Sequence, residues 1–345
     1  MSTRKRRSTA SAIAIAAAVT TGAALLLTAC GPAATAKAGS TASGTAAAPA
    51  HPSSPANPSA PASQPPSSGG TAPATTLNGT SGNGLTISDG ADYVVMNGTR
   101  VDFGTIVRDL SWNPAGTKAA FIDGSGNLVV ANPEGSGQVV VARNPGGQVW
   151  SHPTWHVTPY DSQDKLPAKD NIFFADSVGG VSRLEGVAAT GGTPAPITLN
   201  ADFGDNVPAL PQTGNTWPNA GGAQGTSVYA NSGNGEVYVR DDYLRQMGSP
   251  ETPGSEPAVS ADGEIVFVRS VAGHDHLFEL TLQSSHQAAK DLTPNATTDY
   301  NEPAWSPDGK TIAARTPSGV VTLAADGSGT PELVSSYAGL PAYRG

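Results

Sequence analysis

The sequence predicts an all-β fold, a six-bladed β-propeller with four-stranded blades, and three observations lead to that prediction. A short strand-and-turn motif recurs along the chain at the spacing of a propeller blade. Gly-rich turns separate short β-branched runs within each repeat. The two ends of the repeating region each hold part of one further repeat. No long helical periodicity competes, and a β-sandwich would not repeat one local motif at this step.

The repeated motif is a Pro/Ala/Trp strand followed by a Pro-Asp-Gly-type turn and a β-branched strand. Its clearest copies are residues 302–310 and 256–263, and weaker copies begin at Leu110, at His152 and near Trp217. The Asp-Gly and Gly-Ser pairs between the strands supply the positive φ that tight hairpin turns need. Taking one position of each copy as equivalent gives steps of 42 to 62 residues, for the series Trp112, Trp155, Trp217, Val259 and Trp305. The four tryptophans of this series are expected to fill the space between blades, and the alternative is carbohydrate binding.

The ends of the repeating region complete one another. Residues 340–343 (Leu-Pro-Ala-Tyr) repeat the first-strand motif with no further strand after them. Residues 85–88, 93–96 and 100–103 have the pattern of strands two, three and four, with no first strand before them. We therefore expect one composite sixth blade that closes the ring and hides two sheet edges.

Two blocks of the repeat resemble those of TolB-like propellers, which are related to the WD-repeat class. They are Trp-Ser-Pro-Asp-Gly at 305–309 and Val-Ser-Ala-Asp-Gly at 259–263, and the resemblance covers residues 85 to 343. It implies the fold but not the function, because this fold hosts binding modules and enzymes alike. TolB itself has an additional N-terminal α/β domain, and here a segment of different composition precedes the repeats, so TolB's partners are not carried over.

The N-terminal residues have the composition of a secretory signal. Arg4 to Arg7 are basic, residues 12–27 are apolar, and Leu-Thr-Ala-Cys at 27–30 resembles the bacterial lipobox, in which the cysteine is acylated. We expect a lipoprotein signal peptide over residues 1–29 and lipid attachment at Cys30. The mature protein would then sit on the extracytoplasmic face of the cell membrane. The alternative is a plain signal peptide with an incidental cysteine.

Residues 30–78 are almost entirely Ala, Pro, Ser, Thr and Gly, with Lys37 as the only formal charge. Such a segment cannot bury enough apolar surface to offset its ordering entropy, so it is expected to be a disordered tether. Residues 79–345 then form the propeller. The sequence holds no second cysteine, so no intrachain disulfide supports this domain.

The charge of the predicted propeller limits its partners. All 28 acidic residues lie within it, whereas 5 of the 19 basic residues precede it, so its net charge is −14. Nucleic acid and anionic lipid headgroups would be repelled. We expect a monomer that contacts the membrane only through its anchor.

Motifs of common enzymes are absent from the sequence. There is no Gly-x-Ser-x-Gly elbow, Walker loop, His-Glu-x-x-His or Gly-x-Gly-x-x-Gly after a strand. The favoured interpretation is a binding or scaffold module for a protein, peptide or cell-envelope glycan. The alternative is an extracytoplasmic hydrolase or lyase in the central channel, which needs a carboxylate pair or a His/carboxylate pair facing one pocket.

One set of polar residues is a candidate site. The residue three positions before each repeat Trp, or its equivalent, begins the innermost strand at the rim of the channel. These residues are Asp109, His152, Gly214, Glu256, Glu302 and Leu340. Carboxylates and an imidazole in a ring could hold a hard cation such as Ca²⁺. The hairpin His274-Asp275-His276 is expected on the same face. The alternative is a hydrated polar rim.

Overall fold

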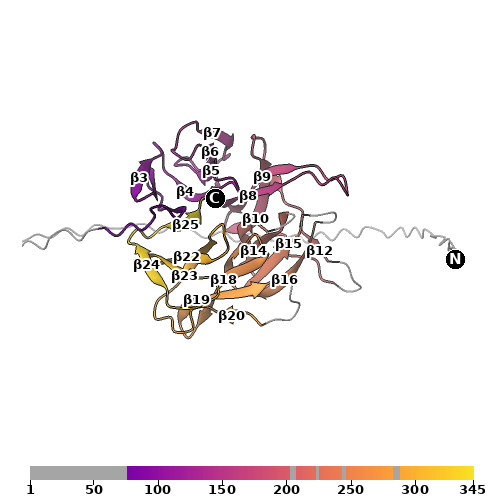
Figure 1. Ribbon diagram of the computed structural model, residues 1–345. Coiled ribbons are helices and arrows are strands. Elements are labelled where there is room, and N and C mark those ends of the chain that lie inside the picture. The colour runs from indigo at the N-terminus through magenta and orange to yellow at the C-terminus, as the bar shows by residue number, and fades with distance from the viewer. Residues whose placement is uncertain (1–75, 203–206, 223–224, 243–245, 283–287) are drawn as a thin grey trace, which may run out of the picture. The chain divides into compact units, whose positions relative to one another are not determined.

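Six sheets of mainly antiparallel strands, each the blade of a propeller, make up the part of the chain that the structure describes (Figure 1). This computed structural model describes residues 76–345 apart from 203–206, 223–224, 243–245 and 283–287. All of them belong to one compact unit, Gly70–Gly345. The described residues contain no α-helix, and so no helix there that could span a membrane. The expected signal peptide and most of the expected tether lie outside the described residues.

The strands of each blade follow one another from the central channel outward. Blade 1 is β25 (Leu340–Tyr343), β1 (Leu85–Ser88), β2 (Tyr93–Met96) and β3 (Thr99–Asp102), and blade 2 is β4 (Arg108–Trp112), β5 (Ala119–Ile122), β6 (Leu128–Ala131) and β7 (Val139–Ala142). Blade 3 is β8 (Gln148–Thr158), β9 (Lys169–Val178), β10 (Val181–Ala188) and β11 (Ala195–Pro196), and blade 4 is β13 (Asn215–Ala220), β14 (Ser227–Asn231), β15 (Glu236–Arg240) and β16 (Met247–Pro253). Blade 5 is β17 (Ser255–Val259), β18 (Glu264–Val271), β19 (His274–Thr281) and β20 (Lys290–Asp291), and blade 6 is β21 (Asn301–Trp305), β22 (Thr311–Thr316), β23 (Gly319–Ala324) and β24 (Glu332–Ser335).

The composite blade is confirmed. Strand β25 pairs antiparallel with β1, with Tyr343 opposite Leu85 and Leu340 opposite Ser88. A second contact lies at the outer edge of blade 6, where Asn78 forms a bridge with Ser335 and the Gly79 N–H donates to the Val334 carbonyl at 2.7 Å. The N-terminal end of the described chain therefore contacts both blade 1 and blade 6, and the folded part begins slightly before residue 79.

The apolar core is divided among the six seams between neighbouring blades. Each hydrophobic cluster draws buried side chains from two adjacent blades, as Trp112 and Val94 do between blades 1 and 2. Because both faces of every sheet are covered, all four residues of β5 are buried and the strand shows no polar alternation. Trp155 and Trp305 pack in two other seams, as the repeat predicts.

Blade 4 departs from the four-stranded pattern. A short strand, β12 (Asn200–Ala201), pairs parallel with β16 and gives this sheet a fifth strand. In the other blades the fourth strand forms the outer edge of the sheet. In blade 4 the hydrogen bonds of β12 cover that edge of β16. The repeat spacing could not predict this strand, because it belongs to the connection between blades 3 and 4.

Candidate functional site

The inner strands of five blades share one irregularity. Pairing between the first and second strands shifts register within each of β4, β8, β13, β17 and β21, as in a β-bulge. Each bulge holds one non-glycine residue at positive φ: Asp109 (55°), His152 (51°), Trp217 (52°), Glu256 (49°) and Glu302 (54°). This conformation costs about 1–3 kcal/mol for each such residue and persists only where the surrounding fold imposes it. Leu340, at the sixth position, pairs in regular register with Ser88.

Blade 4 corrects one part of the sequence prediction. Trp217 had been aligned with Trp112 and Trp155, which placed Gly214 at the rim. In the structure Trp217 itself occupies the bulge, and Ala220 takes the seam position of Trp112. Gly214 lies outside the cavity lining and donates its N–H to the Ser182 carbonyl. The proline that follows Trp217 matches the proline that follows His152, Glu256, Glu302 and Leu340, and this pattern gives the correct alignment.

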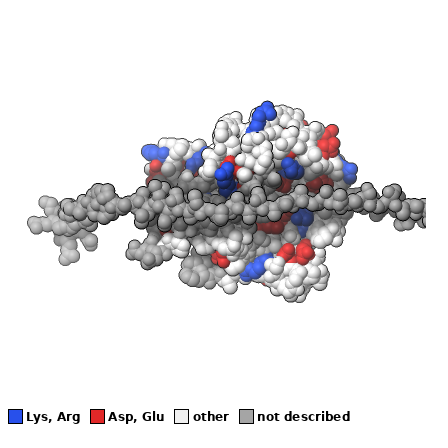
Figure 2. Space-filling model, turned by 180° about the vertical axis from the view of Figure 1, so that it is seen from behind, with Lys and Arg blue, Asp and Glu red and all other residues white. Residues whose placement is uncertain are grey.

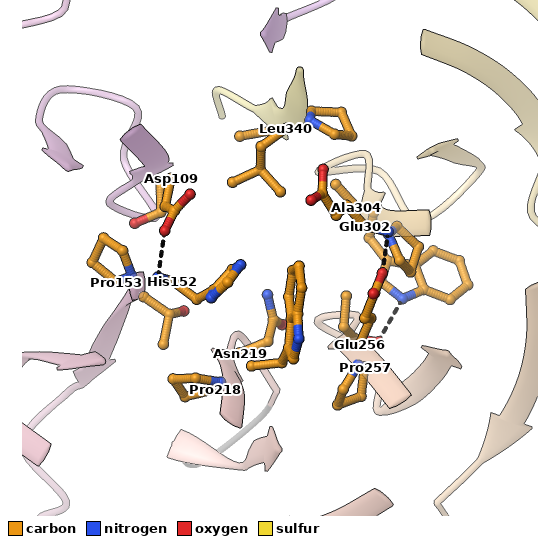
Figure 3. Close-up of a pocket in the computed structure, with 18 of the residues that line it drawn as sticks. Asp109, His152, Pro153, Pro218, Asn219, Glu256, Pro257, Glu302, Ala304 and Leu340 are labelled. Atoms are coloured by element: carbon orange, nitrogen blue, oxygen red, sulfur yellow. Dashed lines mark hydrogen bonds between the residues drawn. The ribbon is translucent and has the colours of Figure 1, made fainter. Parts of the chain in front are cut away.

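The bulges surround a single cavity at the channel mouth, drawn in Figure 3. Its volume is about 220 Å³, and the first strand of every blade contributes to its lining. In each blade the part of the first strand that lines the cavity begins with one residue. These six residues are Asp109, His152, Trp217, Glu256, Glu302 and Leu340. Five of the six residues expected at the rim therefore lie around one space, and Trp217 replaces Gly214. We refer to these six residues as the mouth ring.

Two carboxylates of the mouth ring connect neighbouring blades. Asp109 Oδ2 accepts a hydrogen bond from the backbone N–H of His152 at 3.0 Å, and Glu256 Oε2 accepts one from that of Glu302 at 2.6 Å (Figure 3). Three further polar side chains of inner strands or of β1 do the same for the next blade. They are Ser88 to Leu110 N, Thr154 to Ala220 N and Asn219 to Val259 N. Part of the ring therefore stabilises the seams.

Glu302 is held by an arginine of its own blade. Arg315 on β22 donates from Nε to Glu302 Oε2 at 2.5 Å and from Nη2 to Oε1 at 2.9 Å. This bidentate pair raises the pKa of Arg315 and occupies both carboxylate oxygens. Glu302 is therefore satisfied within its own blade.

Glu256 has the largest carboxyl pKa increase at the mouth. Burial raises its pKa to about 7, although the hydrogen bond from the Glu302 N–H acts in the opposite direction. The negative charges of Glu302 and Asp275 add to the increase. Near neutral pH this side chain therefore exchanges between its acid and its carboxylate form, in contrast to an ordinary surface glutamate.

His152 is a neutral imidazole with an unused nitrogen. Burial lowers its pKa more than the charges of Asp109 and Glu302 raise it. Its Nδ1 atom is excluded from solvent and has no hydrogen-bond partner among the described residues. The imidazole lies against the indole of Trp217, with ring centroids 3.5 Å apart. Ser111 Oγ, which also lines the cavity, is likewise buried without a partner in the described structure.

The histidines of the 274–276 hairpin point to two different acidic partners. His274 Nδ1 lies 3.3 Å from Asp299, and His276 Nδ1 lies 2.9 Å from Asp291. Neither lines the mouth cavity. Within the described part of the chain no group of three or more His, Cys, Asp or Glu side chains is arranged to hold a metal ion. Calcium binding at the mouth ring stays a prediction.

The outer surface offers no comparable concentration of charge in the view of Figure 2. On that face Asp and Glu side chains are interspersed with Lys and Arg wherever described atoms are visible. This face therefore shows no patch of a single charge sign that would mark a binding surface.

No family model matches the chain, and no curated protein is similar to it in sequence. Several solved structures are similar at low identity. A chain of a nidogen/laminin complex is 11% identical over 75% of this chain and 97% of its own length, with a TM-score of 0.49. Regucalcin, a calcium-binding protein from Agrobacterium tumefaciens, is 12% identical over 77% and 94%, with a TM-score of 0.45. A puromycin-hydrolysing peptidase from Mycobacterium tuberculosis is 11% identical over 76% and 48%, with a TM-score of 0.43. The assignment of the fold rests on the strand pairing described above.

Proposed function

We propose that this chain is a lipid-anchored, extracytoplasmic binding module that captures a protein, peptide or envelope glycan at the mouth of its propeller channel. The observation that supports this most is the ring of five non-glycine residues held at positive φ around one cavity. Backbone strain repeated at five equivalent positions is typical of functional sites. Glycine would adopt this φ without cost, so the side chains at these positions have a role beyond backbone geometry.

The polar groups of the cavity support binding of a ligand. His152 Nδ1 and Ser111 Oγ are buried without partners in the described structure. Burying a polar group without a partner costs about 1–3 kcal/mol, a cost that the fold carries in the lining of this cavity. Trp217 adds a large aromatic surface of the kind that dominates binding energy at recognition sites.

A capture experiment with the full chain tests the proposal. Envelope extract is passed over immobilised wild type, Trp217→Ala and, as a matched control, Val139→Ser. Val139 is a 56% exposed residue on β7, the outermost strand of blade 2. We expect a component that the wild type and the control retain and that Trp217→Ala loses. Equal retention by Trp217→Ala would show that the mouth is not the binding site.

The location of the protein is a separate part of the proposal. The lipobox-like residues 27–30 support acylation at Cys30, and the composition of residues 31–78 supports a tether that holds the propeller away from the membrane. Cys30→Ser should abolish incorporation of labelled palmitate and release the protein or leave its precursor uncut. Unchanged labelling and membrane retention in that variant would remove the lipoprotein assignment.

A further inference from the structure

Five backbone hydrogen-bond donors around the mouth cavity are already engaged. The backbone N–H groups at the inner ends of the seams donate to side chains of the preceding blade, including His152 N to Asp109 and Glu302 N to Glu256. The N–H groups of Leu110, Ala220 and Val259 are engaged in the same way. An anionic ligand would depend on such N–H groups and would meet none of these five free.

Hydrogen-bond acceptors remain on three blades. Asp109 and Glu256 each use one carboxylate oxygen, and within the described residues the second oxygen of each accepts no side-chain or backbone hydrogen bond. The neutral imidazole of His152, which lines the same cavity, carries one acceptor nitrogen. Asp109, His152 and Glu256 stand around the cavity drawn in Figure 3. The cavity therefore fits a ligand group that is rich in donors.

Aromatic surface and charge favour a positive ligand group. Trp217 lines the same cavity, and indole is the aromatic ring that binds cations best. Asp109 is a carboxylate with no arginine or lysine partner among the described residues, and the predicted propeller carries a net charge of −14. Both features attract a cation and disfavour an anion.

The cavity suits an organic cation better than a metal ion. Calcium takes six to eight oxygen ligands, whereas both oxygens of Glu302 are occupied by Arg315. A volume of about 220 Å³ is several times the ~30 Å³ share of one liquid water molecule, which leaves room for the end of a side chain.

We infer that the mouth ring recognises an ammonium or guanidinium group, presented by a Lys or Arg side chain of a partner peptide. Asp109 and Glu256 accept its N–H donors, the imidazole of His152 accepts a third, and Trp217 packs against its alkyl chain. The inference rests on the proposed function and names the chemical class of its ligand.

Titration of the full chain with small probes tests the inference. The probes are N-acetyl-lysine methylamide and its uncharged counterpart N-acetyl-norleucine methylamide, which has the same straight side chain without the ammonium group. The indole N–H resonance of Trp217, assigned by its loss in Trp217→Phe, is followed by two-dimensional NMR. We expect a saturable shift with the lysine probe and at least a tenfold weaker effect of the norleucine probe.

Two variants with the same change of charge localise the effect. Glu256→Gln should weaken binding of the lysine probe by about tenfold. Asp308→Asn, in the exposed turn after β21 with its carboxylate 60% accessible, should leave the affinity unchanged. An equal loss in both variants would mean that the probe senses only net charge, and would overturn the inference.

Three other results would also overturn it. Equal shifts with the two probes would show that the ammonium group is not recognised. A melting temperature that rises with CaCl₂ and loses this response in Glu256→Gln, Glu302→Gln would show that the mouth binds a metal ion instead. If no probe shifts Trp217 while the captured envelope component still depends on it, the ligand class is wrong and the binding function stands. If that component is independent of Trp217, the proposed function fails as well.

Discussion

Two groups of charged side chains in this propeller contain similar residues and differ in how their carboxylates are satisfied. One is the mouth ring. The other lies between blades 3 and 4, where Asp242, only 3% exposed, contacts His156 Nε2 at 3.1 Å and Arg240 Nη1 at 2.9 Å and forms an ion pair with Lys169 Nζ. Gln246 Nε2 donates to the same carboxylate at 3.0 Å. We call these residues the Asp242 cluster.

The pKa values of Asp242 and Glu256 reflect this difference. Burial acts to raise the pKa of Asp242, but His156, Lys169 and Arg240 outweigh it and hold the pKa well below its ordinary range. Burial also raises the pKa of Glu256, and there the Glu302 N–H and the charge of Arg315 oppose the increase without outweighing it, so the pKa reaches about 7. A carboxylate compensated by the protein serves the fold, whereas one left uncompensated at a cavity is available to a ligand.

The largest expected effect comes from opening the ring. Deleting residues 339–345 removes β25, exposes the edge of β1 and takes Leu340 from the mouth ring, while the Asp242 cluster stays complete. We expect a loss of several kcal/mol in the free energy of unfolding, or aggregation, because hydrogen bonds and apolar burial are lost together. Urea unfolding checks this. A truncated chain that melts within a degree or two of the full one would contradict the assignment of blade 1.

Asp242→Asn should be the most destabilising single substitution of the comparison. The amide keeps the shape but leaves three basic groups around a neutral side chain, two of them buried. Removing one partner of a buried ion pair typically costs about 3–5 kcal/mol. Chemical denaturation at pH 7 measures the change. A cost below ~1 kcal/mol would show that the Asp242 cluster contributes little to the fold.

Glu256→Gln should have the opposite sign. The folded carboxyl group binds its proton more tightly than the unfolded one, so wild-type stability falls as pH rises from the ordinary pKa of 4.5 toward about 7. Each pH unit in this window costs up to about 1.4 kcal/mol. The glutamine variant lacks this loss and should be more stable than wild type at pH 8 by about 1–3 kcal/mol. Parallel stability curves for the two proteins between pH 4.5 and 8 would refute the uncompensated burial of Glu256.

The strain of the mouth ring should be visible as a smaller difference between two substitutions. Trp217→Gly and Trp217→Ala both remove the indole, but only glycine adopts a φ of 52° without cost. We expect the glycine variant to be more stable by about 1 kcal/mol. Leu340 has no positive φ, so Leu340→Gly should be less stable than Leu340→Ala. Thermal melts of the four variants measure these differences in stability. If glycine and alanine had the same order of stability at both sites, the bulge would not be strained.

The sequence predicted the fold and most of the mouth because both depend on a repeated local motif. Residues at the same position of the motif lie at the same depth in the channel. The motif therefore predicted that Asp109 and Glu302 lie near one another, and both line one cavity although they belong to blades 2 and 6. The predicted alignment of the repeats is wrong at Trp217, because it rests on the tryptophan side chain and not on the proline that follows it.

Other features depend on partners that no local pattern encodes. Asp109 and Glu256 accept backbone N–H groups 43 and 46 residues further along, one blade away in each case. The spacing of the repeat is consistent with these hydrogen bonds. It predicts them only if bonds between neighbouring blades are already assumed. The Asp242 cluster joins side chains from β8, β9, β15 and the segment after β15, at positions that the repeat does not share, so the sequence gives no reason to group them.

The most direct test of the comparison is a measurement of the two carboxyl pKa values in the full chain. Carboxyl-carbon NMR shifts followed from pH 3 to pH 9, with Glu256→Gln and Asp242→Asn used for assignment, report each group separately. The account predicts that Glu256 titrates with a midpoint of about 7 and that Asp242 stays ionised below its ordinary pKa of 3.8. A midpoint for Glu256 near its ordinary value of 4.5 would mean that its carboxylate is already well solvated or paired, and the mouth ring would then hold no uncompensated carboxylate for a ligand.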